Sequence, residues 1–140
     1  MKVDNIVVGV SEAATSRVAG RRAFELAALT GATVHVVTAL ADPESTVLEV
    51  GSDRFELDEL DDVERDIETW IRSLAPTVPW RVRGVDGKPA DSLIEVAEQV
   101  GADLIVVGNV RMQGFGRMFG SVGNDVTHHA PCDVLVVKTV

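Results

Sequence analysis

One stretch of the chain, Leu104-Ile105-Val106-Val107-Gly108, decides the fold class. It is a continuous apolar run, whereas a strand with one face in water would alternate apolar and polar residues. Two further runs share this character, Ile6-Val7-Val8 and Val134-Leu135-Val136-Val137. Such runs are typical of strands that are buried on both faces, as in a parallel sheet covered by helices.

Strand and helix patterns alternate along the whole chain. Between the apolar runs, apolar residues recur at three- and four-residue steps, as in a helix with one buried face. The predicted strands are Asn5–Val10, Thr33–Ala39, Arg81–Val85, Asp103–Gly108 and Asp133–Lys138. The predicted helices are Ser16–Thr30, Asp53–Ala75, a helix that starts at Pro89 and is capped by Gly101, and Ser121–Ala130.

This alternation predicts one α/β domain over residues 1–140. Right-handed crossovers give an open parallel five-stranded sheet of order 3-2-1-4-5, with two helices on each face. Ligands of such sheets bind beyond the carboxyl ends of the strands, where the strand order reverses. The loops after Val10 and Gly108 lie at that point, and Leu40–Ser52 is one long connection of undecided structure.

Charge is distributed unevenly along the chain. The net charge is −9, and twelve acidic residues lie between Asp42 and Glu68 against two arginines. The helix pattern places most of these acids on a solvated face, and the rest of the chain is close to neutral. The overall acidity and the absence of Tyr argue against nucleic acid as a partner, but they leave room for a small anionic ligand.

We expect neither a signal peptide nor a transmembrane segment in this sequence. It has no apolar run of 18 residues, and its first five residues lack the plan of a signal peptide. The single cysteine, Cys132, cannot form an internal disulfide and is expected to be a small core residue. We therefore expect a cytoplasmic protein without a membrane partner.

No set of residues assembles a catalytic or metal site. His35 lies within a predicted strand and is expected to pack there or to be partly exposed, rather than to be catalytic. His128 and His129 are adjacent on a helix and point about 100° apart, so they cannot hold one ion together. Asp125 and His129 are one helical turn apart and are expected to form a surface pair. We expect no dedicated enzyme activity.

A glycine-bearing loop follows the strand that ends at Gly108. It contains Gly114 and Gly116, and Gly120-Ser121 is predicted to open the next helix. Glycines let backbone N–H groups approach a phosphate, and the first N–H groups of a helix lack internal partners, so the loop can hold an anion. The spacing is neither that of a Walker loop nor that of the dinucleotide fingerprint. An exposed connection that only reverses the chain fits equally well.

Several segments together resemble a known family. They are Ile6-Val7-Val8-Gly9-Val10 with Ser16 and Ala19, Val85 to Ala90, Gly101 to Gly108, Gly120-Ser121-Val122, and His129 to Val137. With these segments the chain resembles a universal stress protein over nearly its whole length. The resemblance implies a fold of the adenine nucleotide alpha hydrolase type, usually a homodimer, and in one branch of the family an ATP site.

The ATP-binding branch of the family carries the pattern G-x-x-G, nine residues, then G-S/T. Gly108 matches its first glycine and Gly120-Ser121 its end. Arg111 stands at the second glycine, and only eight residues separate it from Gly120. An Arg side chain there either pairs with a phosphate or blocks the approach of the backbone.

The end of the first strand departs from the family as well. Ser11 stands where the family has an Asp that binds adenosine, and Glu12 where it has a Gly. An adenine nucleotide, a weaker or different nucleotide mode, and no nucleotide all stay open. The residues predicted to contact a nucleotide are Val10, Ser11, Ala39, Val107, Gly108, Asn109, Arg111, Arg117, Gly120, Ser121 and Val122.

The leading functional prediction is a small stress-response regulatory module that binds ATP, AMP or cyclic AMP without dedicated catalysis. One alternative is a nucleotide-free dimeric scaffold. The other is a slow ATP hydrolase, for which Ser11 removes the best-placed metal-binding carboxylate. An apolar strand at a sheet edge invites pairing, so we expect a homodimer through Asp133–Lys138.

Overall fold

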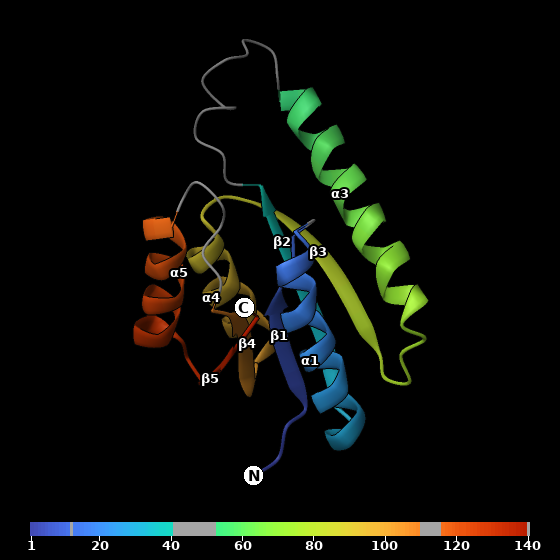
Figure 1. Ribbon diagram of the computed structural model, residues 1–140, viewed down its shortest axis with the longest axis vertical. Coiled ribbons are helices and arrows are strands. Elements are labelled where there is room, and N and C mark those ends of the chain that lie inside the picture. The colour runs from blue at the N-terminus through green and yellow to red at the C-terminus, as the bar shows by residue number, and fades with distance from the viewer. Residues whose placement is uncertain (12, 41–52, 110–115, 140) are drawn as a thin grey trace.

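The computed structural model describes residues 1–11, 13–40, 53–109 and 116–139. Five parallel strands form one open sheet in the order β3-β2-β1-β4-β5 (Figure 1). The predicted fold class and strand order are confirmed. The strands are β1 (Asn5–Gly9), β2 (Thr33–Leu40), β3 (Trp80–Asp86), β4 (Leu104–Gly108) and β5 (Asp133–Val137), and the helices are α1 (Ala14–Thr30), α3 (Asp53–Ser73), α4 (Pro89–Val100) and α5 (Gly116–His129).

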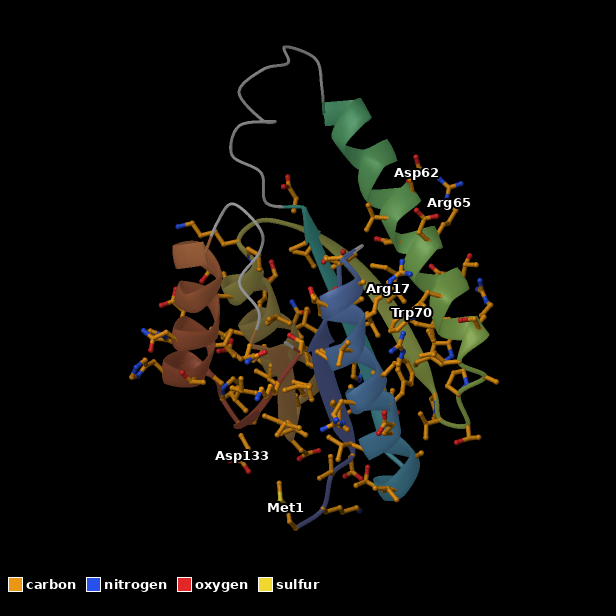
Figure 2. All side chains as sticks on the ribbon, in the orientation of Figure 1. Met1, Arg17, Asp62, Arg65, Trp70 and Asp133 are labelled. Atoms are coloured by element: carbon orange, nitrogen blue, oxygen red, sulfur yellow. The ribbon has the colours of Figure 1, made fainter. Side chains whose placement is uncertain are left out.

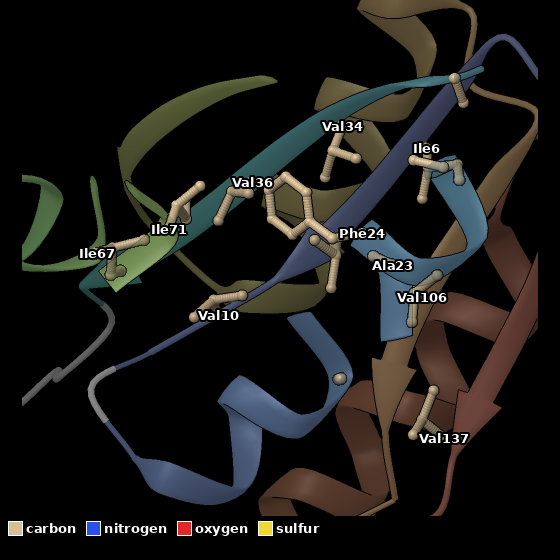
Figure 3. Packing of buried hydrophobic residues seen from close by; sticks show 14 residues of the cluster. Ile6, Val10, Ala23, Phe24, Val34, Val36, Ile67, Ile71, Val106 and Val137 are labelled. Carbon is tan, nitrogen blue, oxygen red and sulfur yellow. The ribbon is translucent and has the colours of Figure 1, made fainter. Parts of the chain in front are cut away.

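The helices cover the sheet from both sides and create two cores. Helices α1 and α3 pack over one face, where Phe24 and Ile71 meet Val34 and Val36 of β2 (Figure 3). Helices α4 and α5 pack over the other face, and the buried residues of this second core include Val7, Leu93, Val96, Ile105 and Val126.

The central strand β1 contributes to both cores. Ile6, Val7 and Val8 are each 0% exposed, and they alternate between the two faces. Burying one such side chain contributes roughly 1.5–3 kcal/mol, so the three-residue run fixes β1 in the middle of the sheet. The prediction that this run is buried on both faces is confirmed.

The edge strand β5 differs from this prediction. Val137 is buried, but Val136 is 50% exposed and Val134 is only partly buried. The expectation of burial on both faces is therefore wrong for Val136, because β5 is the outermost strand and neighbours enclose it on one side only.

The sequence predicts the end of α1 correctly but not the start of α5. Helix α1 ends at Gly31, whose φ of 80° is left-handed and whose N–H donates to the Ala27 carbonyl oxygen, as the predicted C-cap requires. Helix α5 begins at Gly116, five residues before the expected start at Ser121. No helix in the described parts of the chain is long and apolar enough to cross a membrane.

Candidate functional site

The carboxyl ends of β1 and β4 meet at the point where the strand order reverses. Val10 and Val107 are buried there, and the Val10 N–H donates to the Val37 carbonyl oxygen at 3.0 Å. Ala39 lies close to the end of β2 and is partly buried. Because β1, β2 and β4 are parallel and adjacent, these predicted site residues lie at one edge of the sheet.

Ser11 is held by a closed set of hydrogen bonds at the start of α1. Its N–H and its hydroxyl both donate to Ser16 Oγ, at 2.9 and 3.1 Å. The Ala13 N–H donates to Ser11 Oγ at 3.2 Å, and Ser16 Oγ is close to the carbonyl oxygens of Ser11 and Ala13. The Ser11 hydroxyl therefore faces the first turn of α1, where it positions the loop after β1.

Ser16 was not predicted to have this role. The signal in the sequence is a hydroxyl residue just inside a predicted helix, five positions after Ser11 at the strand end. Short hydroxyl side chains often bond nearby backbone at such starts. The spacing alone does not indicate which of the two serines would face a ligand.

The loop after β4 begins with a second polar contact. The Asn109 N–H donates to the Val137 carbonyl oxygen at 2.9 Å, and Asn109 Oδ1 accepts from the Thr139 N–H at 2.7 Å and its hydroxyl at 3.1 Å. A Cβ at Gly108 would come within 3.2 Å of Thr139 Cγ2. Gly108 therefore lets the chain after β5 approach β4 closely, a structural reason for this glycine that the ligand-based prediction lacked.

The remaining predicted phosphate residues belong to α5 or precede it. Arg111 lies outside the described residues. Arg117 is in the first turn of α5, and Gly120, Ser121 and Val122 follow within the same helix. Their N–H groups are thus part of the helix rather than at its opening, which corrects the predicted boundary. The first turn of α5 contains no acidic residue, so its positive dipole end is not neutralised there.

A contact between helices supports the site from the α3 side. A Cβ on Gly20 of α1 would lie 2.8 Å from Cη2 of Trp70 and 3.0 Å from Cγ2 of Val10. The Arg17 guanidinium lies over the same indole, 5.4 Å from its centroid (Figure 2). Trp70 thus packs closely on α1 beside Val10, so α3 and the carboxyl end of β1 share one packed contact.

His35 is a buried packing residue, as predicted. It is 7% exposed, and its Nε2 is hydrogen-bonded to Asn5 Oδ1 at 3.0 Å. Burial lowers its pKa, and the positive charges of Arg83 and Arg81 lower it further. The imidazole is therefore neutral at pH 7, which suits a buried side chain.

The other candidate reactive groups do not form a site. Burial raises the pKa of the Cys132 thiol, and Asp133 and Asp103 raise it further, so the unreactive thiol form dominates. His129 Nδ1–H donates to the carbonyl oxygen of Asp125 at 3.0 Å, instead of pairing with its carboxylate as predicted. Among the described residues, no group of three or more His, Cys, Asp or Glu could hold a metal ion.

Comparison with known proteins gives one consistent family. The sequence profile of the Universal stress protein family matches residues 2–138. A universal stress protein of Methanothermobacter thermautotrophicus is 38% identical over 65 residues, which is 46% of this chain and 44% of that protein. The alignment thus spans less than half of the length of that relative.

Two solved structures match over nearly the whole chain. A universal stress protein in complex with cAMP has a TM-score of 0.74 and 30% identity, with all of both chains covered. The universal stress protein of Archaeoglobus fulgidus in complex with dAMP has a TM-score of 0.64 and 26% identity, with 99% of this chain and 100% of that chain covered. Both ligands are adenine nucleotides with a single phosphate.

Proposed function

The chain belongs to the universal stress protein family, and we propose on this basis that it is a small regulatory module that binds an adenine nucleotide without dedicated catalysis. The observation that carries the proposal is its likeness, over its full length and at 30% identity, to a relative solved with cAMP. ATP, AMP and cyclic AMP are the ligands to be compared.

The base and ribose would lie at the carboxyl edge of β1 and β2, beside Val10, Ser11 and Ala39. Buried Val10 and partly buried Ala39 offer apolar contact there. The phosphate would lie toward α5, whose dipole attracts an anion and whose first turn contains Arg117. Gly120, Ser121 and Val122 follow in the next turn of α5, where their N–H groups belong to the helix. They would therefore serve the phosphate through the small size of Gly120 and the hydroxyl of Ser121, with Arg111 as a further positive charge.

We expect the binding to be weak. Ser11 supplies a neutral hydroxyl at the end of β1, and that hydroxyl is already hydrogen-bonded to Ser16. A ligand must compete with this contact, and a neutral group makes weaker hydrogen bonds than a carboxylate. Ser11 also leaves the strand end without a carboxylate for a metal ion, which disfavours the alternative of an ATP hydrolase.

Titration calorimetry with ATP, AMP and cyclic AMP tests this proposal. The variant Gly120→Val/Ser121→Val should lose the binding heat. The matched control is Gly123→Val/Thr127→Val, which makes similar changes later in the same helix, and a Cβ at Gly123 has open space. Unchanged binding in the first variant would place the ligand elsewhere. The absence of heat with all three nucleotides at millimolar concentration would favour the nucleotide-free scaffold.

We also propose that the protein is a homodimer joined through β5 and the residues around it, Asp133–Lys138. Val136 is half exposed on this edge strand, and an open apolar edge favours pairing with a second chain. Sedimentation should give twice the chain mass at micromolar concentration. Val136→Lys should shift the protein toward the monomer, whereas a monomeric wild type would contradict the proposed interface.

A further inference from the structure

The two edge strands of the sheet, β5 and β3, differ in whether a side chain hydrogen-bonds to their outward-facing backbone. At β5, no side chain of the described residues hydrogen-bonds to the outward-facing backbone, and Val136 is half exposed. At β3, the opposite edge, the Gly84 N–H donates to Glu64 Oε1 of α3 at 2.7 Å. A carboxylate therefore occupies a backbone donor that would otherwise be free to pair with another strand.

The orientation of Gly84 makes this contact an edge contact. The Val34 N–H of β2 donates to the carbonyl oxygen of Pro79, the residue before β3, at 3.0 Å. Alternate residues of a strand in a sheet interior direct their backbone groups to opposite neighbours. The backbone N–H and C=O groups of residues 81, 83 and 85 therefore point toward β2. Those of Gly84 point away from the sheet, where the Gly84 N–H donates to Glu64.

A second contact holds the same helix along the same strand. The Arg72 guanidinium of α3 lies over the Trp80 ring of β3, 5.8 Å from its centroid. Glu64 and Arg72 are eight residues apart, about 12 Å along a helix. Gly84 and Trp80 are four residues apart, about 13 Å along a strand. The spacings match if the two elements run antiparallel, and Figure 1 shows α3 beside β3 in that orientation. The bond of Glu64 and the contact of Arg72 therefore hold α3 along β3.

A cleft lies beside β3 and makes this edge of the sheet accessible. It opens between β3 and α4, and Arg83, Glu95 and Gln99 line it together with Glu64 and Gly84. Arg83 donates to Gln99 Oε1 there at 3.0 Å, and Gly84 on the outer side of β3 stays only partly buried. Without Glu64, the Gly84 N–H would be an available donor on an accessible edge, the condition under which strands of two molecules pair.

We propose that Glu64 and Arg72 close the β3 edge against strand addition by a second copy of this chain, so that self-association is directed to β5. The statement that self-association is directed to β5 rests on the homodimer proposed above. Glu64 is the decisive residue, since a charge-assisted hydrogen bond to backbone is stronger than a neutral one. The partner that it excludes is an extended strand, which would need the Gly84 N–H.

The test compares Glu64→Ala with Asp66→Ala, which removes the same charge from an exposed position of the same helix. In Glu64→Ala, the Gly84 amide should exchange with solvent about tenfold faster or more, as expected for the loss of a charged hydrogen bond. In sedimentation, the average mass of Glu64→Ala should rise with protein concentration and exceed the mass of the parent protein. Asp66→Ala should match the parent. Glu64→Gln, which keeps an acceptor oxygen but loses the charge, should restore only part of the protection of the Gly84 amide.

Glu64→Ala and Asp66→Ala are also each combined with Val136→Lys, which places a charge on β5 and should disrupt the proposed dimer. There Glu64→Ala should restore a concentration-dependent dimer, formed through β3. The proposal is overturned if Glu64→Ala sediments as its parent in both backgrounds, if Gly84 exchange is unchanged, or if Asp66→Ala associates equally. If Val136→Lys alone stays dimeric, the β5 interface is wrong, and the comparison in the wild type still decides the role of Glu64.

Discussion

Replacing Gly20 by Ala should destabilise the protein, although Ala is the better helix former. In a helix interior this change contributes about 1 kcal/mol of stability. At Gly20, however, the new Cβ would lie 2.8 Å from Trp70 Cη2 and 3.0 Å from Val10 Cγ2. Overpacking of a core costs roughly 1–3 kcal/mol. A shift of the indole would also disturb its contact with Arg17, so the net loss should be about 1 kcal/mol.

Gly123→Ala is the matched control for this prediction. Gly123 lies within α5, and a Cβ there would have nothing within 4 Å, so only the helix propensity acts. This variant should gain about 1 kcal/mol. Urea unfolding gives both free energies. Trp emission of the folded protein should change in Gly20→Ala, where Trp70 is displaced, and not in Gly123→Ala. If Gly20→Ala gains as much stability as Gly123→Ala, the close contact between α1 and α3 is wrong.

Three further predictions concern stability. Val106→Asp places an unpaired carboxylate at a position that is 0% exposed, and a cost of several kcal/mol should abolish the cooperative melting transition followed by circular dichroism. The lowered pKa of His35 means that the folded state binds fewer protons than the unfolded chain, so stability should fall as the pH drops below 6.5, and His35→Gln should flatten this decline in urea titrations. Asp103→Ala removes the carboxylate that accepts from the N–H groups of Asp4 and Asn5, which should cost about 1 kcal/mol and speed amide exchange at both. An unchanged exchange rate would contradict that role.

Local patterns were sufficient to predict the sheet. The run Ile6-Val7-Val8 predicts a strand buried on both faces, and all three residues are buried in the central strand. Gly31 and Gly101 predict helix ends, and both adopt the left-handed conformation of a C-cap. These features depend on residues close together in sequence, which is why the sequence alone specifies them.

Contacts between distant segments could not be predicted in this way. The apolar stripe of α3 places Trp70 on a buried face, but its approach to Gly20 depends on how α3 crosses α1. The bond between Glu64 and Gly84 depends on the same docking. The sequence predicts the start of α5 too late, because Gly120-Ser121 resembles the helix opening that follows an anion loop, whereas the helix begins at Gly116.

The most direct test of the central claim, a nucleotide site at the carboxyl edge of β1 and β4, is amide NMR during titration with cyclic AMP. The largest shifts should fall on Ser11, Gly108 and Asn109 and on the first turns of α5. The amide signals of Asp4 and Asp103, which precede the amino ends of β1 and β4, should stay unchanged. Shifts that centre on Gly84 and Gln99, or no shifts at millimolar nucleotide, would contradict the proposed site.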